Sequence, residues 1–352
     1  MKHFGHFVAF IILAINALFT GLLLLTAYSP YIYPVTHPVQ SCLGLTFPIF
    51  ALINGCFLIF WLVIQRYKSA LLPLIGFLLC YSQIRTYLPI NFRTDNLPEG
   101  SIKILSYNIM GFDGASKKNG ENAILTYLKE SNADILCLQE YATVESPHYL
   151  TQKDIENELV DYPYHRINAV GSASGYTNKI ACYSKYPILS ARVLKYTSEY
   201  NGSVAYELKL GEDTITLINN HLESNKLTKA DKDIYEGMLK SPEKEKVKSG
   251  ARLLIRKLAE ASAIRAPQAD TIVREISSSR HPSVIVCGDF NDTPISYAHR
   301  VIAENLDDAF TQSGRGLGIS YNQNKFYFRI DNILISKNLK SYNCTVDRSI
   351  KE

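Results

Sequence analysis

Five short polar motifs stand directly after apolar, strand-like stretches in the C-terminal two-thirds of this 352-residue sequence. An α/β scaffold presents functional side chains at the ends of its strands, where they line a crevice. Each motif alone is more often a turn, a surface tip or a satisfied polar pair. Together they predict one site rich in carboxylate, amide and imidazole groups. The motifs are Ser106-Tyr107-Asn108, Gln139-Glu140, Asn219-Asn220-His221, Gly288-Asp289-Phe290-Asn291 and Arg329-Ile330-Asp331.

These residue types suit the hydrolysis of a phosphate ester. Attack of water on such an ester needs a hard cation that neutralises the non-bridging oxygens, and Mg²⁺ prefers carboxylate oxygen while it keeps several waters. Glu140 is the predicted metal ligand, and Asn108 is expected to assist it directly or through water. We therefore expect Mg²⁺ as the cofactor, or Mn²⁺ in its place.

The motifs resemble those of the endonuclease/exonuclease/phosphatase superfamily, a Mg²⁺-dependent group that includes abasic-site endonucleases, secreted deoxyribonucleases, neutral sphingomyelinases and inositol polyphosphate phosphatases. The resemblance covers roughly residues 101–336. It implies a four-layer α/β/β/α sandwich with the active site at one edge of the paired sheets. It assigns Asp289 to orienting or deprotonating the attacking water and Asn291 to holding that water or a phosphate oxygen. His221 would donate a hydrogen bond to the developing negative charge.

Three further residues follow from the same resemblance. Asn178 and Lys179 lie in a segment where relatives contact phosphate, so they are predicted to bind substrate, although Lys179 is equally well read as a plain surface lysine. Asp331 is the last predicted catalytic residue, and the family pairs this aspartate with a histidine in a later Ser-Asp-His segment. Only 21 residues follow Asp331, and none of them is histidine.

The missing histidine leaves two hypotheses open. The first is an active phosphoesterase, and the alternative is a catalytically impaired or non-catalytic, membrane-tethered binding or scaffold protein of the same fold. Residues 340–346 are predicted to form the penultimate strand of the family fold. Because losing a closing strand would expose an unpaired edge, we favour a truncated version of a normal enzyme over a complete chain that has shed the group.

The order of periodic segments after residue 100 predicts an α/β domain. Residues 91–100 form a short polar linker with Pro98 and Gly100. Alternating or apolar runs predict strands, and apolar residues at helical spacing predict helices at 122–131 and 251–277. Strands and helices mixed in this order are typical of sheets covered by helices. The predicted strands are 102–108, 134–138, 179–184, 204–210, 214–219, 283–287 and 330–335.

The N-terminal region is apolar enough to cross a membrane. Residues 7–28 and 42–64 carry no charge, and each stretch is long enough to cross about 30 Å of hydrocarbon as a helix. Residues 70–84 form a shorter third candidate. A cleaved signal peptide is disfavoured because the first run is too long and further apolar segments follow it. We therefore predict about three transmembrane helices in residues 1–90, a linker in 91–100 and the hydrolase domain in 101–352.

Basic residues in the short loops predict the orientation. Lys2, Arg66 and Lys68 favour a cytoplasmic N-terminus and second loop, which would put the large domain outside the cytoplasm, although Arg85 and Arg93 favour the reverse. The seven cysteines show no CxxC pair and no metal spacing, and those in strand-like runs are predicted to be buried thiols. Free thiols are more typical of a reducing compartment, but buried ones persist in oxidising spaces.

Net charge narrows the class of partner. The first 100 residues carry five basic and two acidic residues, so the rest of the chain accounts for about +1 of the formal +4. That balance lacks the broad basic surface of a non-specific nucleic-acid binder. Residues 226–248 are rich in lysine and could form a lipid-facing or nucleic-acid-facing arm, but a solvated loop is the more common reading. The expected partners are a phosphate-ester substrate, either nucleic acid or phospholipid-like, and the lipid bilayer. No protein partner is inferred.

Overall fold

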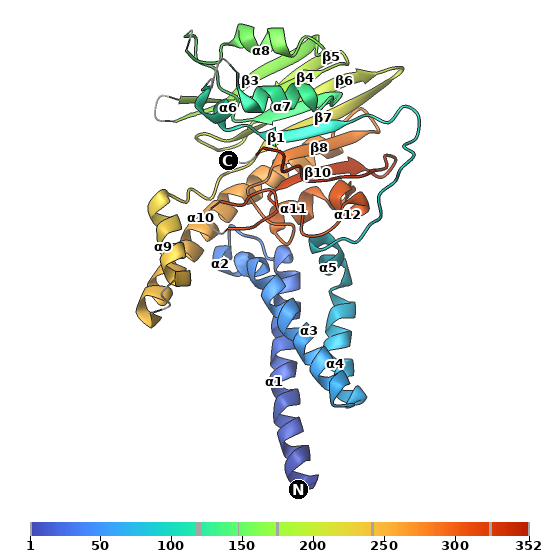
Figure 1. Ribbon diagram of the computed structural model, residues 1–352, viewed down its shortest axis with the longest axis vertical. Helices are drawn as coiled ribbons and strands as arrows, with labels where there is room; N and C mark the ends of the chain where they lie inside the picture. Colours follow the sequence, from blue (N-terminus) through green and yellow to red (C-terminus); the bar gives the residue numbers. More distant parts are fainter. Residues whose placement is uncertain are drawn as a thin grey trace.

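The computed structural model describes residues 2–116, 121–146, 148–173, 176–240, 243–323 and 326–350. Two β-sheets are stacked face to face, and helices cover their outer faces (Figure 1). Three apolar cores lie between the resulting layers: one between helices and the first sheet, one between the sheets, and one between the second sheet and its helices. The predicted four-layer α/β/β/α sandwich is confirmed, and a bundle of N-terminal helices projects from it.

The first sheet has four strands in the order β1-β2-β4-β3, and the second has six in the order β5-β6-β7-β8-β10-β9. The strands of the first sheet are β1 (Ile104–Asn108), β2 (Ile135–Gln139), β3 (Tyr164–Ala173) and β4 (Tyr176–Ser184). Those of the second are β5 (Ile188–Val193), β6 (Gly202–Leu210), β7 (Asp213–His221), β8 (Val284–Asp289), β9 (Leu306–Asp308) and β10 (Asp331–Ser336). Every predicted strand before residue 340 is present.

Strand alternation explains why the sheets bury both faces. In β2, Ile135 and Cys137 point into the core between the sheets, whereas Leu136 and Leu138 point toward the helices of the first layer. Cys137, Cys182 and Cys287 all lie in the core between the sheets, and they are free and buried as predicted.

The helices divide between the two outer layers. The first sheet is covered by α6 (Met110–Gly114), α7 (Ala123–Glu130) and α8 (Gln152–Glu158). The other domain helices are α9 (Lys229–Lys240), α10 (Lys244–Ser277), α11 (Tyr297–Ile302) and α12 (Ala309–Ser313). The predicted helix at 251–277 is the C-terminal part of α10, which begins earlier, at Lys244. The predicted helix at 122–131 is α7, whose first turn is capped by the Asn122 side chain.

The prediction of a strand at residues 340–346 is wrong. The described structure has neither a strand nor a helix there. Side chains take the hydrogen bonds that a sheet partner would have made: the Ser341 backbone N–H donates to Gln312 Oε1, and the Cys344 N–H donates to Ser313 Oγ. Both acceptors lie on or beside α12, so the segment follows that helix and does not pair with a sheet edge.

The N-terminal bundle consists of α1 (Lys2–Tyr28), α3 (Phe47–Val63) and α4 (Tyr67–Leu79), and α5 (Tyr81–Tyr87) follows α4 after a break at Cys80. Among the described residues, two helical stretches are long and apolar enough to cross a membrane, Phe4–Tyr31 and Pro38–Val63. The third candidate is shorter because α4 has only 13 residues. Two of the predicted stretches are thus long enough to span a membrane, and α4 is the shorter third apolar helix, which is roughly consistent with the predicted three.

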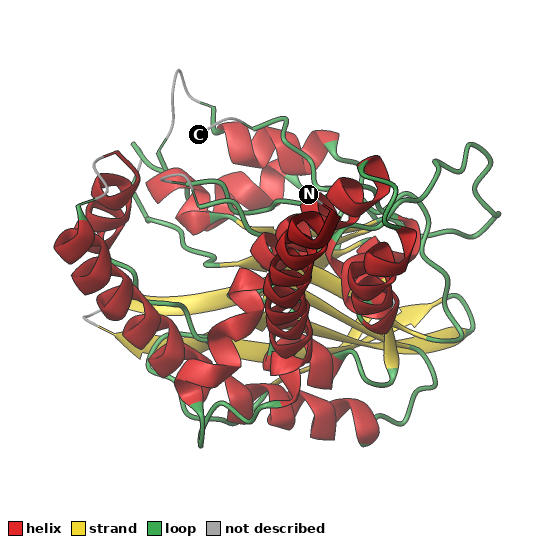
Figure 2. Cartoon of the chain, turned by 90° about the horizontal axis from the view of Figure 1, so that it is seen from below, coloured by secondary structure: helices red, strands yellow, loops and turns green. Residues whose placement is uncertain are grey.

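The bundle is held against the α/β domain at two places. The connection between α1 and α3 contains η1 (Ser29–Tyr31), α2 (Pro38–Ser41) and η2 (Cys42–Thr46), and it packs on α10 and α11. There the Arg300 Nε donates a 2.9 Å hydrogen bond to the Pro30 carbonyl. At the other end, the Arg329 guanidinium donates to the carbonyl of Thr86 in α5, at 2.9 Å. Figure 2 shows the bundle end-on against the domain.

Candidate active site

The five polar motifs converge at one edge of the two sheets. In the strand register Asn108 lies beside Gln139, while Asp289 lies between His221 and Asp331. The chain leaves two of these strands in strained backbone conformations, since Glu140 and Asn291 have positive φ angles of 52° and 51°. Such outliers cluster at functional sites, where the surrounding structure holds them.

Gly288 is needed for the close approach of two of these strands. Its φ is 125°, and a Cβ at this position would collide with the carbonyl oxygen of Asn220. Only glycine tolerates both conditions. The Gly-Asp-Phe-Asn motif is therefore more than a turn, because its first residue brings β8 close enough to β7 to set Asp289 beside His221.

Asn108 joins the two sheets by bridging their carboxylates. Its Nδ2 donates to Glu140 Oε1 at 2.9 Å and to Asp289 Oδ2 at 3.2 Å, while its Oδ1 accepts from the Met110 backbone N–H. His221 Nε2 lies 3.6 Å from Glu140 Oε1 and 3.9 Å from Asp289 Oδ2. These four side chains form a compact cluster, which we call the carboxylate cluster.

The Asn178 side chain orients His221. Its Nδ2 donates to the Tyr200 carbonyl at 3.0 Å, which fixes the amide orientation, and the same Nδ2 lies 3.3 Å from His221 Nδ1. Nδ1 must therefore accept, so the proton of the neutral ring is on Nε2. Burial lowers the pKa of His221, although the charge of Glu140 opposes the shift. The ring is neutral at pH 7, and its N–H points into the carboxylate cluster.

Asp289 is buried and Asp331 is half-buried, and both have raised pKa values. Burial raises the pKa of Asp289 to about 6, although hydrogen bonds from the Asn291 N–H and from Asn108 oppose the shift. Burial and then the charge of Asp289 raise the pKa of Asp331 to about 8. Asp331 Oδ1 has no hydrogen-bond partner within the described chain. The crevice thus holds more carboxylate oxygen than its own donors neutralise.

Two other predicted residues differ from the expected arrangement. The Asn291 side chain donates to the Leu222 carbonyl at 3.0 Å, and its backbone N–H donates to Asp289 Oδ1 at 2.8 Å, so it fixes the loop around Asp289. Lys179 follows Asn178 on β4, and its side chain shares the sheet face of Ala181 and Tyr183, which packs against the helices. No hydrogen bond or ion pair joins Lys179 to the cluster in the part of the chain that the structure describes.

A family model described as Endonuclease/Exonuclease/phosphatase family matches residues 105–350. The chain belongs to this family. Residues 9–87 match a second model, described as a domain of unknown function. No curated protein is similar enough in sequence to match the chain. The resemblance inferred from the five motifs is therefore confirmed at the level of the family, whose members are generally hydrolases of phosphate esters.

Several solved structures are distantly similar to this chain. Truncated TDP2 from Caenorhabditis elegans is 18% identical with a TM-score of 0.44, over 68% of this chain and 86% of that chain. The human Nocturnin catalytic domain with bound sulfate is 17% identical with a TM-score of 0.45, over 70% and 84%. A family protein from Leptotrichia buccalis is 14% identical with a TM-score of 0.46, over 68% and 89%. The assignment rests on the family model and not on these likenesses.

The sequence reasoning missed a buried arginine that supports the family site. Arg265 lies in the middle of α10 and contacts Asp292 Oδ2 with Nε and Nη2, both at 3.1 Å. Its Nη1 donates to the Glu223 carbonyl and to Asn225 Oδ1, both at 2.9 Å. Arg265 therefore ties the loop after His221 to the loop after Asp289. No local pattern marks it, because one arginine in a charged helix looks like any solvated residue.

A family member of this kind is expected to bind a divalent metal, and the residues fit one with few protein ligands. In the described ranges no three His, Cys, Asp or Glu side chains lie close enough to form a metal cage. Magnesium does not require a cage, because it binds through one or two carboxylates and keeps waters. Glu140 and the unpartnered Asp331 Oδ1 supply such oxygen. Asn108 points its amide nitrogen at the carboxylates and bridges them. In this arrangement its oxygen accepts from the Met110 N–H and is not presented to a metal.

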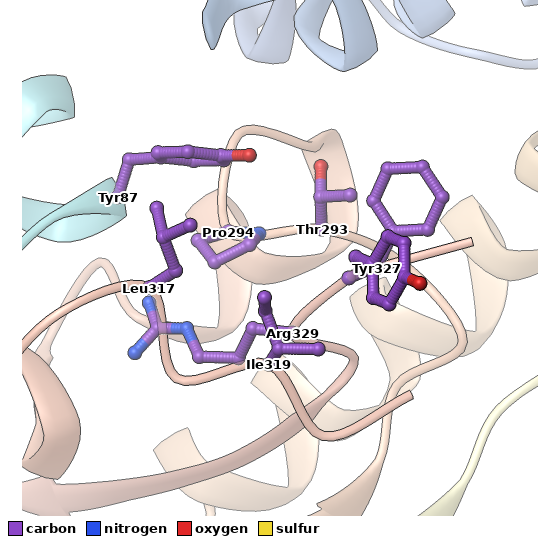
Figure 3. Close-up of a pocket in the computed structure, with 8 residues that line it drawn as sticks. Tyr87, Thr293, Pro294, Leu317, Ile319, Tyr327 and Arg329 are labelled. Carbon is purple, nitrogen blue, oxygen red and sulfur yellow. The ribbon is translucent and has the colours of Figure 1, made fainter. Parts of the chain in front are cut away.

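A small pocket adjoins the site on the side of the bundle (Figure 3). Its walls include Tyr87 at the end of α5, Thr293 and Arg329. The cavity measures about 10 Å³, which is room for a single water. Thr293 and Arg329 are each two residues from a predicted catalytic residue, and Tyr87 comes from the N-terminal helices, so the pocket lies between those helices and the loops that follow β8 and precede β10.

Proposed function

We propose that this protein is a membrane-anchored, divalent-metal-dependent phosphoesterase. The observation that carries the proposal is the carboxylate cluster, in which residues from both sheets meet at one edge: Asn108, Glu140, His221 and Asp289. Its two acidic groups, the buried Asp289 and the half-buried Glu140, repel each other, which suits a site completed by a cation and a phosphate ester.

Each group has a defined chemical role. Magnesium held by Glu140 would neutralise the non-bridging oxygens of the ester. With a pKa of about 6, Asp289 is ionised at neutral pH and accepts a proton from the attacking water. The Asn291 backbone N–H holds one oxygen of Asp289, so the other faces the crevice. The neutral His221 donates Nε2–H to the negative charge that develops on the phosphoryl group. Asp331, whose pKa of about 8 is raised by burial and by the charge of Asp289, is mostly protonated at neutral pH until a cation binds beside it.

The polarity of the bundle supports membrane insertion. Its polar side chains face inward: Thr20 Oγ1 donates to Asn54 Oδ1 at 2.7 Å, and Trp61 Nε1 donates to Asn16 Oδ1 at 3.0 Å. All four residues are buried. Large apolar side chains face outward instead, including Phe4, Phe7, Phe10, Leu52 and Val63. An inward polar network with an apolar exterior suits a lipid solvent, in which buried polar groups must pair with one another.

The same bundle supports an extracytoplasmic catalytic domain. Lys2 and the turn between α3 and α4, with Arg66 and Lys68, lie at the end of the bundle farthest from the domain (Figure 1). The connection from residue 29 to 46 lies at the domain end and carries no Lys or Arg. Basic residues favour the cytoplasmic side, so the domain is on the other side. Its substrate is either a nucleic acid or a phospholipid-like ester, and near-neutral charge argues only mildly against bulk DNA.

The activity is tested with the full chain in lipid nanodiscs and a generic phosphodiester, bis(p-nitrophenyl) phosphate. We expect Mg²⁺-dependent turnover that excess EDTA abolishes. His221→Ala should lower kcat by about 10²–10³ because one transition-state donor is lost, and Glu140→Gln should abolish the Mg²⁺ response. Lys153→Ala, at an exposed position of α8, is the matched control and should leave kcat within about twofold. Equal turnover with EDTA or in Glu140→Gln would refute the proposal.

The same preparations test the scaffold alternative and the substrate class. A ligand that binds only the native state must raise Tm, so millimolar Mg²⁺ should raise Tm in the parent chain and not in Glu140→Gln. Absence of any shift together with absence of turnover would favour a non-catalytic protein. A panel of DNA, RNA, a sphingomyelin-like lipid and sugar phosphates then ranks the substrate classes by kcat/KM.

A further inference from the structure

The helical hairpin of α9 and α10 carries an excess of positive charge. Residues 226–257 contain ten Lys or Arg and five Asp or Glu. Four of the basic residues, Lys244, Lys248, Arg252 and Arg256, recur every fourth position along the first turns of α10, and all four are exposed. Because residues four apart share a helix face, they form a line, which we call the basic stripe.

The basic stripe faces the side of α10 that meets the membrane bundle. Gly250 lies on the opposite side, where a Cβ would collide with Met238 and Ile234 of α9. Farther along the helix, Ser262 packs against Ser41 of α2, with 3.5 Å between their Oγ atoms. Ile255 and Lys248 precede Ser262 by seven and fourteen residues, spacings that place all three near one face of the helix. The face of α10 that touches α2 therefore continues toward the N-terminus of the helix as the basic stripe.

Neither the helix dipole nor neighbouring ion pairs explain why these basic residues are here. The N-terminal turns of a helix favour acidic side chains, because the helix dipole places positive charge there. Arg256 has an ion-pair partner in Glu260, whereas no ion pair within the described residues involves Lys244, Lys248 or Arg252. Glu245 is the only acidic residue among the first turns on this face. Ile255 lies within the stripe and is 44% exposed, so the face is both basic and apolar.

The position of the hairpin suggests its partner. In Figure 1 the hairpin hangs from the domain on the same side as the bundle, and Figure 2 shows it beside the bundle and uncovered by it. Given the proposed membrane anchor, on which this inference rests, the bilayer surface lies directly against that face. We propose that the basic stripe binds the anionic phospholipid headgroups of the bilayer that holds the bundle, with Ile255 inserted among them.

Hydrogen exchange of the full chain in nanodiscs tests the proposal. Discs of phosphatidylcholine alone are compared with discs that contain about 30% phosphatidylglycerol, because anionic lipid contributes about a fivefold factor per basic residue at the surface. We expect amides of residues 244–256 to exchange at least about tenfold more slowly in the anionic discs. Salt near 1 M should remove the difference, since it screens charges beyond about 3 Å.

Two variants with equal charge change separate the stripe from general attraction. Lys244→Gln/Lys248→Gln/Arg252→Gln should lose the protection, whereas Lys153→Gln/Lys195→Gln/Lys337→Gln, on other exposed parts of the domain, should keep it. Equal exchange in both lipid compositions, or loss in both variants, overturns the inference. Protection by an added oligonucleotide in phosphatidylcholine discs, without an effect of phosphatidylglycerol, makes the stripe a nucleic-acid surface instead. A chain that fails to enter discs or shows no Mg²⁺-dependent turnover refutes the proposed function, whereas an anchored and active chain without protection refutes only this inference.

Discussion

The buried Asp289 and the half-buried Asp331 lie side by side on β8 and β10, with little to neutralise them. Asp289 and Asp331 are direct neighbours in the strand register, and each has a pKa well above that of an exposed aspartate. A hydrogen bond with the Ser320 hydroxyl opposes the raised pKa of Asp331. The Asp331 Oδ1 has no hydrogen-bond partner among the described residues. Such a pair costs folding free energy whenever both groups are ionised, and a bound cation removes that cost.

The metal-free protein should therefore lose stability as pH rises. A carboxyl whose pKa is raised from about 3.9 in the unfolded chain stabilises the fold fully below that value and loses this contribution as pH passes the folded pKa. For folded values of about 6 and about 8, Tm in EDTA should fall by about 10 °C or more between pH 5 and pH 9. Differential scanning fluorimetry measures it.

Variants separate the contributions of the two carboxyls. Asp331→Asn should flatten the part of the decline above pH 7, and Mg²⁺ should raise Tm chiefly above pH 6. Glu212→Gln, at an exposed turn, is the control and should follow the parent curve. A Tm that rises from pH 6 to pH 9 in EDTA would contradict the raised pKa values.

At the scale of elements, α10 connects parts of the molecule that are distant in sequence. Its middle carries Arg265, which ties together the loops after His221 and Asp289. Gln268, one turn later, accepts from the Glu223 N–H and donates to the Thr197 carbonyl. Earlier turns of the same helix meet α9 and α2. The positions of the catalytic loops therefore depend on a helix that contributes no residue to the carboxylate cluster.

The buried Arg265–Asp292 pair should show strong energetic coupling. Arg265→Met leaves Asp292 uncompensated and should lower the free energy of unfolding by about 3 kcal/mol. The double variant Arg265→Met/Asp292→Asn should lose less than the sum of the single changes. The exposed pair Arg256–Glu260 on the same helix is the control, with an expected coupling of about 0.5 kcal/mol or less. Denaturant titration in detergent measures all of these, and additive effects at Arg265 and Asp292 would contradict the coupling.

The sequence predicted the elements whose signal is local. The hairpin of β6 and β7 follows from alternating apolar residues about a turn at Gly211, and the five motifs follow from polar residues that directly succeed apolar runs. The start of α10 was missed because its first turns are too charged to show an apolar period. Residues 340–346 alternate like a strand, but α12 supplies their hydrogen bonds, which no local pattern reveals.

The residues that surround the carboxylate cluster could not be predicted from local patterns, because tertiary contacts decide which side chains reach it. Asn178 and Lys179 are adjacent in sequence, yet the strand pleat turns them to opposite faces, and only Asn178 reaches His221. The register of β4 against β2 and β3 decides which of the two faces inward, and this register cannot be read from a single strand. Arg265 is likewise recognisable only from its partners in two loops.

At the scale of the whole molecule, charge at the two ends of the bundle should set the orientation. Replacing Arg66 and Lys68 with glutamine removes the basic residues of the far turn and should give a mixed orientation. Replacing Arg85 and Arg93, at the domain end, should leave the orientation uniform. A reporter active only in the cytoplasm, fused after Glu352, measures the outcome, and reporter activity in the parent chain would overturn the proposed topology.

The two separate attachments between bundle and domain restrict how the enzyme meets its substrate. A domain on one flexible linker can take many positions and orientations around its anchor, so it can meet substrates that approach from any direction. Here Arg300 holds the connection after α1, while Arg329 holds α5 and Asn91 fixes the chain just beyond it, so each attachment restricts rotation about the other. If the bundle is anchored in a membrane as proposed, the carboxylate cluster keeps one height and one orientation relative to the bilayer. Encounters then depend on how the substrate travels, and a molecule confined to the plane of the membrane always arrives at the same elevation.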